Sequence, residues 1–396
     1  MASPLILIKT LGLLETVVIF LFPIALVTSI TLSGILLYVG VAVLILLLLF
    51  DRGNKFKNYN FTSLDKAFII YIILFTLSKL INTGFDEGLN TFSRVSQDYF
   101  VFLWLSLFTS CKREKLKLIK SAIFIAAILT ISYGIMQFFH LDLFHRQSNI
   151  ERLSGFHKNS YTYGGQLIIF FFFLFSQLER NLKGLLCLLL SLLAFFCMFN
   201  TLERAVIIGV AVGLIFYVIA NKFRKKDLFS LILFFGIPSL FILLFNNKLF
   251  KRFKAVSQAK KKNVRFKLWE MALSLWKRNV IFGVGKFPVV AHQLQGQFKI
   301  QYLTHAHNVF LQLLVTNGLV GLLSFLNLFF NSVKVLFRSA SINKLSLAYI
   351  SLLIAFLVEG CFEYLWGDSE VRYLLLFFMS YVISNSFCAK SVKLKT

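Results

Sequence analysis

The residues best suited to chemistry stand where a polar segment runs into a long apolar one. Thr304-His305-Ala306-His307-Asn308 leads directly into the apolar stretch VFLQLLVTNGLVGLLSFLNLFF. An imidazole takes up or releases a proton near neutral pH, and a carboxamide both donates and accepts hydrogen bonds. We therefore predict that His307 and Asn308 form a reactive pair at the start of a membrane helix; the alternative is that His307 only caps this helix.

Membrane-spanning helices are the elements that must position this pair. Hydrophobic residues make up 58% of the 396-residue chain, and its apolar runs are long enough to cross ~30 Å of hydrocarbon. The sequence predicts an all-α polytopic integral membrane protein that forms a single domain over residues 1–396. Within the tenth span, Gly318 and Gly321 predict a small-residue face that another helix approaches closely. We expect about twelve spans, roughly at residues 5–30, 32–50, 66–82, 95–111, 118–139, 160–178, 184–200, 204–221, 228–246, 307–333, 345–363 and 371–389.

The orientation of these spans follows from the placement of Lys and Arg, which are concentrated in cytoplasmic loops. With the N-terminus inside, the cytoplasmic loops and the C-terminal tail carry 21 of them, against six in the short outer loops. Both termini are therefore predicted to be cytoplasmic. Residues 247–306, between the ninth and tenth spans, form a long periplasmic loop with 13 Lys or Arg and one acid. Nucleic acid is excluded as a partner on that side, so lipid phosphates, pyrophosphates and anionic glycans are the expected partners.

Part of this loop has the pattern of an amphipathic helix at the membrane surface. Trp269 and Trp276 suit the depth of the lipid headgroups, and Gly283 and Gly285 follow as helix breakers. The apolar residues at helical spacing are Val264, Leu268, Met271, Leu275 and Trp276.

Three arginines are predicted to lie on the same outer face as His307. Arg152 precedes a span, Arg204 opens one, and Arg265 begins the amphipathic helix. A guanidinium stays charged and matches phosphate oxygens bidentately, and an unpaired charge at membrane depth costs on the order of 2.5–3.5 kcal/mol. For Arg204 alone, the alternative is that it extends to the outer headgroups.

The sequence shows no arrangement typical of a metal site or of a disulfide framework. The outer face has few acids and no DxD pair, the cysteines lack CxxC spacing, and the histidines fit no zinc motif. His305 and His307 are two residues apart, which does not place them on one helical face. Glu359 and Glu363, four residues apart near the end of the eleventh span, are interpreted as partners of a nearby Arg or Lys and not as a proton relay.

Four segments in register resemble the bacterial O-antigen ligases and the related O-antigen polymerases. They cover roughly residues 150–325, and the sequence departs from the family pattern at Glu203, where a small polar residue is usual. The segments are RLSGFHKNSYTYGG, TLERAVIIG, the run Arg265-x3-Trp269-x3-Leu273 with Asn279-Val-Ile-Phe-Gly283-Val-Gly285, and His307-Asn308-x-Phe-Leu-x-x-Leu-x-x-x-Gly318-x-x-Gly321.

The resemblance implies a glycosyltransferase of the bacterial inner membrane that needs neither metal nor cofactor. It would move a glycan from undecaprenyl pyrophosphate to a sugar hydroxyl of lipid A–core, on the periplasmic side and with inversion. His307 would act as the base or orient the acceptor, and Arg204 and Arg265 would clamp the pyrophosphate. Arg152 is a further candidate clamp, and Asn308 and Asn159 are candidates for positioning hydroxyls.

Two other functions fit parts of the sequence. An O-antigen polymerase would use the same donor to extend a carrier-linked glycan, but family polymerases tend to have two sizeable outer loops and this chain has one. A polysaccharide flippase or transporter would also have about twelve spans, together with internal repeats or broken helices, and the sequence indicates neither. We therefore favour the ligase.

Overall fold

The computed structural model describes residues 4–50, 59, 61–109, 112–143, 152–179, 181–222, 264–287, 292, 304–338 and 343–393. These residues form twelve α-helices and one 3-10 helix, with no strand among them. The helices are α1 (Pro4–Thr28), α2 (Ile30–Phe50), α4 (Ser63–Thr83), α5 (Phe85–Thr109), α6 (Arg113–Phe138), α7 (Ser160–Ser176), α8 (Leu182–Asn200), α9 (Arg204–Ala220), α13 (Val264–Trp276), α16 (Val309–Arg338), α17 (Lys344–Glu359), the 3-10 helix η2 (Leu365–Gly367) and α18 (Ser369–Lys393).

Six of these helices are long and apolar enough to cross a membrane, and α7 and α9 are apolar but shorter. The prediction of an all-α membrane protein is confirmed, whereas the count of twelve spans and the periplasmic loop stay predictions. The expected span at 228–246 and the basic stretch up to residue 263 lie outside the described residues. The six spans cover Ile6–Thr28, Ile30–Phe50, Arg113–Phe138, Leu182–Asn200, Val309–Arg338 and Ser369–Ala389.

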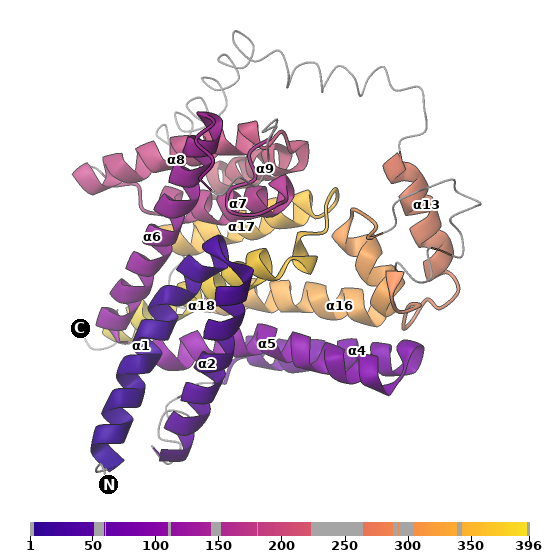
Figure 1. The fold of residues 1–396 in the computed structure, drawn as a ribbon, viewed down its shortest axis with the longest axis horizontal. Coiled ribbons are helices and arrows are strands. Elements are labelled where there is room, and N and C mark those ends of the chain that lie inside the picture. The colour runs from indigo at the N-terminus through magenta and orange to yellow at the C-terminus, as the bar shows by residue number, and fades with distance from the viewer. Residues whose placement is uncertain are drawn as a thin grey trace.

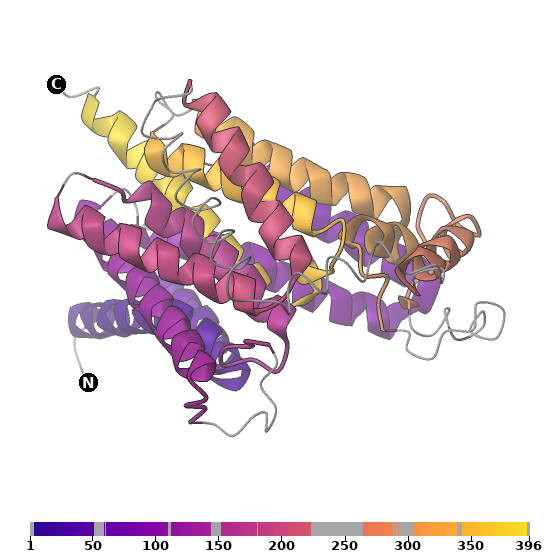
Figure 2. The same cartoon turned by 90° about the horizontal axis from the view of Figure 1, so that it is seen from above.

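The helices pack around α7 and α18 (Figure 1). In α7 every residue from Thr162 to Ser176 is buried, including the aromatic run Phe170 to Phe173. α8 and α17 pack against α7, α9 packs against α17, and α4 lies between α5 and α16. In Figures 1 and 2 both chain ends lie on one side of the molecule and α13 lies on the opposite side.

Helices α9 and α17 approach each other closely at two glycines, Gly209 and Gly213, that were not predicted from the sequence to have this role. A Cβ atom on Gly209 of α9 would lie 2.6 Å from the carbonyl oxygen of Ala355, and one on Gly213 would lie 2.7 Å from that of Ser351. Small residues four apart let two backbones approach closely, which is a main source of helix association in lipid. This contact aligns the first turn of α9 with the end of α17.

Gly318, predicted to lie on such a small-residue face, instead interrupts α16. Its φ of 67° and ψ of −164° are not helical, so the prediction of a continuous tenth span without a break is wrong. Only glycine adopts this conformation without strain, and no proline marks the position. Gly321 lies one turn further on, beside Asn317 of its own helix and Phe75 of α4.

Residues 280–284, which follow α13 and are called the inserted segment below, fill the break in α16. The N–H groups of Leu319 and Val320 donate to the carbonyls of Val280 and Ile281, at 3.0 and 3.2 Å. The freed carbonyl of Val315 accepts from Val284 N–H at 2.7 Å. Backbone groups at membrane depth must find partners inside the protein, and here the inserted segment supplies them.

Helix α4 completes this arrangement from the other side. Lys79 Nζ donates to the freed carbonyl of Thr316 at 3.1 Å, and both Ser78 Oγ and Asn82 Nδ2 donate to the carbonyl of Phe282. The predicted amphipathic helix is confirmed as α13, with Leu268, Met271, Ala272 and Leu275 buried against Phe287, Ala306 and Val315. The two ends of the inserted segment are therefore fixed to α13 and α16.

Replacing either glycine of this junction should destabilise the protein. A Cβ atom on Gly318 would overlap the backbone of Ile281, and one on Gly283, whose φ is 73°, would lie 2.6 Å from Gly318 N. We expect Gly318→Ala and Gly283→Ala to cost roughly 1–3 kcal/mol each and to lower the apparent melting temperature of the purified protein by several degrees. Gly34→Ala is the control, because a Cβ atom there meets no neighbour. Unchanged melting of both junction variants would contradict the inserted-segment geometry.

Candidate active site

The carboxylate of Glu363 joins three separate segments of the chain. Glu363 lies between α17 and η2, and its side chain is 6% exposed. Nδ1 of His307 lies 2.5 Å from Oε1, Nη2 of Arg265 lies 3.2 Å from Oε2, and Nε2 of His305 lies 3.5 Å from Oε1. Two of the residues predicted to be catalytic, His307 and Arg265, therefore meet on a carboxylate that the sequence analysis did not place in the site.

Local backbone structure leaves the His307 side chain available for this contact. Asn308, not His307, caps α16, because its Oδ1 accepts from Leu311 N–H at 2.9 Å. Its Nδ2 donates to the carbonyl of Cys361 at 2.8 Å, so both ends of this predicted substrate-binding amide are engaged within the protein. The His307 side chain is 33% exposed, and its Nε2 makes no hydrogen bond to a described residue.

The environment of Glu363 keeps this carboxylate ionised. Burial raises its pKa, but hydrogen bonds from His305 and His307 and the charge of Arg265 lower it more, to about 2. An ionised carboxylate on Nδ1 fixes the orientation of the imidazole and stabilises its protonated form when Nε2 accepts a proton. The pair can therefore act as a general base.

A second acid, Asp368, has the opposite shift. Burial raises the pKa of Asp368 to about 6; the charges of Glu370 and Glu363 add to this, and the hydrogen bond from Thr162 Oγ1, at 2.7 Å, opposes it. Asp368 follows η2 directly. A carboxyl with this pKa exchanges a proton easily near neutral pH.

The turn that carries Asp368 is held by a buried ion pair. Arg372 Nε donates to Asp98 Oδ1 of α5 at 2.8 Å, and its Nη1 donates to the carbonyl of Trp366 in η2 at 2.6 Å. Arg372 itself is 6% exposed and lies in the first turn of α18.

Glu203 organises the other side of the site. Arg152 Nη1 lies 3.0 Å from Glu203 Oε1, and Ser160 Oγ donates to the same oxygen at 2.7 Å. The residue that departs from the family pattern thus ties Arg152 to the start of α7. Glu203 is also the N-cap of α9, which places Arg204 at the first helical position. No hydrogen bond or ion pair joins the Arg204 side chain to another residue within the described part of the chain.

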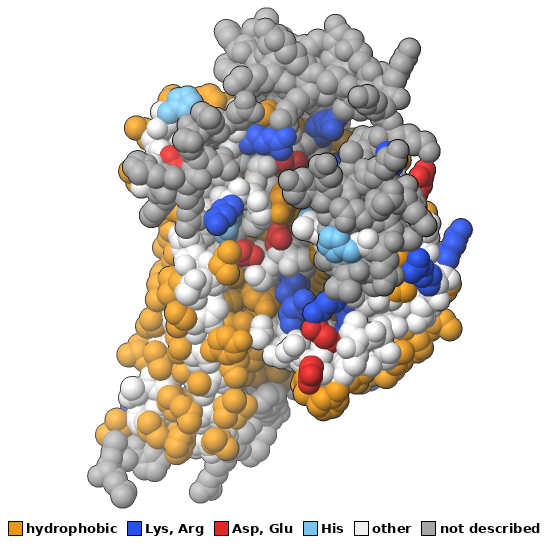
Figure 3. Space-filling view, turned by 45° about the vertical axis from the view of Figure 1, so that its right-hand side comes forward, with side chains coloured by type: hydrophobic (Ala, Val, Ile, Leu, Met, Phe, Trp, Pro, Cys, Tyr) orange, Lys and Arg blue, Asp and Glu red, His pale blue; other side chains and the backbone are white. Residues whose placement is uncertain are grey.

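The two sides are close enough for their charges to interact. The hydroxyl of Tyr161 interacts electrostatically with the carboxylates on both sides, those of Asp368, Glu363 and Glu203. The same hydroxyl accepts a hydrogen bond from Asn159 Nδ2 at 2.7 Å. Figure 3 shows basic, acidic and histidine side chains gathered on one part of the surface, beside a largely hydrophobic part. The structure therefore brings the candidate site residues to one end of the helices.

Glu359 lies beneath this cluster and is buried. It is 1% exposed, and neither carboxylate oxygen has a hydrogen-bond partner among the described residues. Its carboxyl group interacts electrostatically with the charged groups of Glu363, Glu203 and Arg265. The prediction that both glutamates pair with a cation is thus confirmed for Glu363 and wrong for Glu359.

The same cluster contains a group that could ligate a metal ion. The ligand atoms of His305, His307 and Glu363 all lie within 4.8 Å of one another. From the sequence, no metal site was predicted here, because the two histidines fit no zinc motif and their spacing does not place them on one helical face. They precede α16 in a non-helical turn instead, and their ring centroids are 4.2 Å apart.

The sequence analysis missed Glu363, His305, Asp368 and Glu203 as site residues. Glu363 and Asp368 come from the turn between the last two spans, far from the motifs in sequence. The only available signal was the concentration of acids at one predicted span end, since 359, 363, 368 and 370 are all acidic.

A comparison with protein families supports the resemblance noted in the sequence. The model of the family described as O-antigen ligase matches residues 189–326. The described helices and this match together support an all-helical membrane protein related to the O-antigen ligases and polymerases. The match covers about a third of the chain. Arg204, Arg265 and His307 lie within the matched residues, whereas Arg152 and Glu363 lie outside them. No curated protein matches the chain.

The lowered pKa of Glu363 predicts a pH-dependent stability difference for Glu363→Gln. A carboxyl whose pKa falls from 4.5 to about 2 stabilises the folded state above its unfolded value, and this contribution is lost as the pH falls from about 4.5 through about 2. It corresponds to on the order of 3 kcal/mol. Thermal melts should show a lower midpoint for the variant at neutral pH and a narrowing difference at acid pH. The exposed Glu270→Gln is the control, and a difference independent of pH would contradict the shift.

The metal-ligand group predicts inhibition by Zn²⁺. A zinc ion held by His305, His307 and Glu363 would occupy the imidazole and displace Arg265 from the carboxylate. Added Zn²⁺ should therefore block glycan transfer, His305→Ala should weaken the block, and excess chelator should reverse it. His140→Asn, which removes another histidine at a left-handed backbone position, should leave the inhibition unchanged. Equal inhibition of the His305 variant and the wild type would exclude this metal site.

Proposed function

We propose that this protein is an O-antigen ligase that transfers a glycan from undecaprenyl diphosphate to a sugar hydroxyl of lipid A–core. The observation that carries the proposal is the His307–Glu363–Arg265 cluster: a base oriented by a carboxylate, beside a guanidinium, in a chain related to the O-antigen ligases and polymerases. The opposite placement of the chain ends and α13 supports cytoplasmic termini and a periplasmic site in the bacterial inner membrane.

In the proposed reaction, the acceptor hydroxyl binds at the free Nε2 of His307. Nε2 takes the hydroxyl proton while the acceptor oxygen forms a bond to the anomeric carbon. The bond from that carbon to the diphosphate breaks at the same time, and the leaving diphosphate keeps the electron pair. The two oxygens lie on opposite faces of the sugar ring, so the configuration inverts. Glu363 accepts the hydrogen bond from Nδ1–H and stabilises the imidazolium that forms.

The departing diphosphate needs fixed positive charge. Arg265 and Arg204 supply it without a metal ion, and Arg152, held by Glu203, is a third cation on the same side. Arg265 uses one of its five donors on Glu363, and its side chain is 36% exposed, so other donors remain for phosphate oxygens. His305 lies beside His307, with the two rings tilted to each other, and Asn159 donates to the hydroxyl of Tyr161.

Complementation of a deletion strain tests both the residues and the reaction. His307→Ala should lower transfer by about 10²–10⁴-fold, the range typical of a lost general base, at normal expression and membrane insertion. Arg265→Lys should also fail, because a point charge does not replace a bidentate fork. Arg278→Lys, just beyond α13, is the matched control and should remain active. The purified enzyme should work in excess chelator, and wild-type transfer by His307→Ala would remove that residue from the mechanism.

The accumulated products distinguish ligase from polymerase, because both would use the same donor. Deletion of a ligase leaves lipopolysaccharide with bare core while long glycans collect on the carrier lipid. Deletion of a polymerase leaves core carrying a single repeat unit. Electrophoresis of lipopolysaccharide from the deletion strain should show bare core, and single-repeat product would identify a polymerase.

A further inference from the structure

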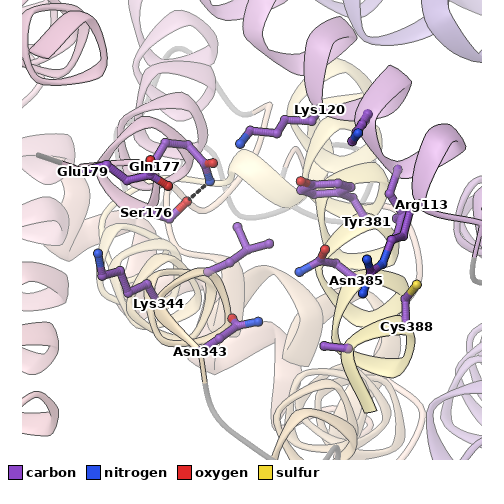
Figure 4. Close-up of a pocket in the computed structure, with 14 residues that line it drawn as sticks. Arg113, Lys120, Ser176, Gln177, Glu179, Asn343, Lys344, Tyr381, Asn385 and Cys388 are labelled. Carbon is purple, nitrogen blue, oxygen red and sulfur yellow. Dashed lines mark hydrogen bonds between the residues drawn. The ribbon is translucent and has the colours of Figure 1, made fainter. Parts of the chain in front are cut away.

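A basic pocket lies at the opposite end of the helices from the candidate active site. Its volume is about 550 Å³, and it is formed by the first turns of α6 and α17, the last turn of α7 with the residues after it, and the last turns of α18 (Figure 4). α7 begins at the active site and ends at the pocket, and α17 begins at the pocket and ends at Glu359. With 16 residues, α17 separates the two places by about 24 Å.

The pocket is strongly positive. Arg113, Lys117 and Lys120 of α6 all line the pocket. Figure 4 shows Arg113 and Lys120 on one side of it and Lys344 on the other. Glu179 is the one acidic residue among those that line it. No ion pair joins any of the three α6 cations to an acid within the described part of the chain. Their mutual repulsion favours a bound anion.

Neutral donors and an apolar floor complete the pocket. Tyr381 is 4% exposed and lines the pocket, yet its hydroxyl makes no hydrogen bond to any described residue. Asn385 adds an amide group near Tyr381, and Gln177 adds another on the opposite side of the pocket. Leu116 and Leu345 are buried and provide apolar surface next to these donors. The Tyr381 hydroxyl opens into the pocket beside the cations, where it can donate a hydrogen bond to an anion.

We propose that this pocket binds the phosphate headgroup of an anionic phospholipid from the leaflet opposite the active site. Basic pockets between membrane helices bind such headgroups. Arg113 matches two phosphate oxygens at once, the lysines add charge, and the Tyr381 hydroxyl donates to a third oxygen. The apolar side chains of Leu116 and Leu345 favour a lipid over a soluble phosphate, because a lipid also has a glycerol and acyl chains that can contact them. The pocket lies on the membrane face that is predicted to be cytoplasmic.

Binding there would join α6 to α17 and α18. In the described part of the chain, α6 and α17 are not packed against each other as a helix pair. Both helices nevertheless contribute side chains to the pocket. A phosphate bridging Lys120 and Lys344 would therefore add a connection that the protein alone lacks. We expect bound lipid to raise the melting temperature of the whole protein.

Native mass spectrometry and thermal melting of the full-length protein in detergent test the proposal. Wild-type protein should retain phosphatidylglycerol in preference to phosphatidylethanolamine and should melt at a higher temperature in its presence. The double variant Lys117→Gln/Lys120→Gln should bind about 30-fold more weakly, the change expected for two membrane-surface cations. Tyr381→Phe should also bind more weakly while melting like the wild type without lipid.

The control has the same charge change at the same end of the molecule. Lys66→Gln/Arg338→Gln removes two exposed cations that do not line the pocket, and its lipid binding should be unchanged. Glycerol 3-phosphate, which has the headgroup chemistry without acyl chains, should give no protection at matched concentration. Equal protection by glycerol 3-phosphate, or equal loss of lipid in the control and pocket variants, would overturn the proposal.

Discussion

The interruption of α16 at Gly318 is the constraint on which the site depends. A helix broken at membrane depth exposes N–H and carbonyl groups that have no water to bind, so another segment must enter and pair with them. The segment from Val280 to Val284 does this, and it is the direct continuation of α13. Because α13 carries Arg265 and the start of α16 carries His307, satisfying the backbone of the break also sets the distance between the two residues. The same backbone hydrogen bonds that close the break therefore also determine the geometry of the candidate site.

Glu363 then orients the side chains of His307 and Arg265, because its carboxylate contacts both of them. It lies in a turn between two buried helices, and Val309 N–H donates to the carbonyl of Gly360 in that turn at 2.7 Å, so the start of α16 and the turn cannot move independently. A carboxylate with three basic neighbours stays ionised, and it holds His307 in one orientation. Asp368, a few residues on, lacks such neighbours and has a raised pKa. Two acids in one turn thus have pKa values shifted in opposite directions, because burial dominates at Asp368 while hydrogen bonds and basic groups outweigh it at Glu363.

The sequence predicted the parts of this arrangement that depend on local pattern. The helical nature of the chain and the amphipathic α13 follow from periodicity, and the prediction that Arg265 and His307 lie on one face follows from charge and motif spacing. The broken helix could not be predicted, because Gly318 and Gly321 have the same spacing as a packing face, and only the inserted segment reveals the difference. Glu363 could not be placed either, since a carboxylate joins His307 and Arg265 through tertiary contacts across 56 and 98 residues. His305 was discounted because a helical turn was assumed where the chain is not helical.

The two ends of the helix bundle differ in how their charges are balanced, and this difference bears on what each can bind. At the active-site end, cations lie beside acids: Arg265 with Glu363, Arg152 with Glu203, Arg372 with Asp98. Such a network has little net charge when empty, which fits the proposed reaction, in which a diphosphate must be held during transfer and released afterwards. At the other end, Arg113, Lys117 and Lys120 face a hollow with a single acid. Glu179 is the one acid beside these cations, so the pocket keeps a net positive charge that would hold a bound anion. Cations paired with acids, as at the candidate active site, are suited to a substrate that must be released. Cations with little acidic charge beside them, as in the basic pocket, are suited to the lipid that we propose stays bound.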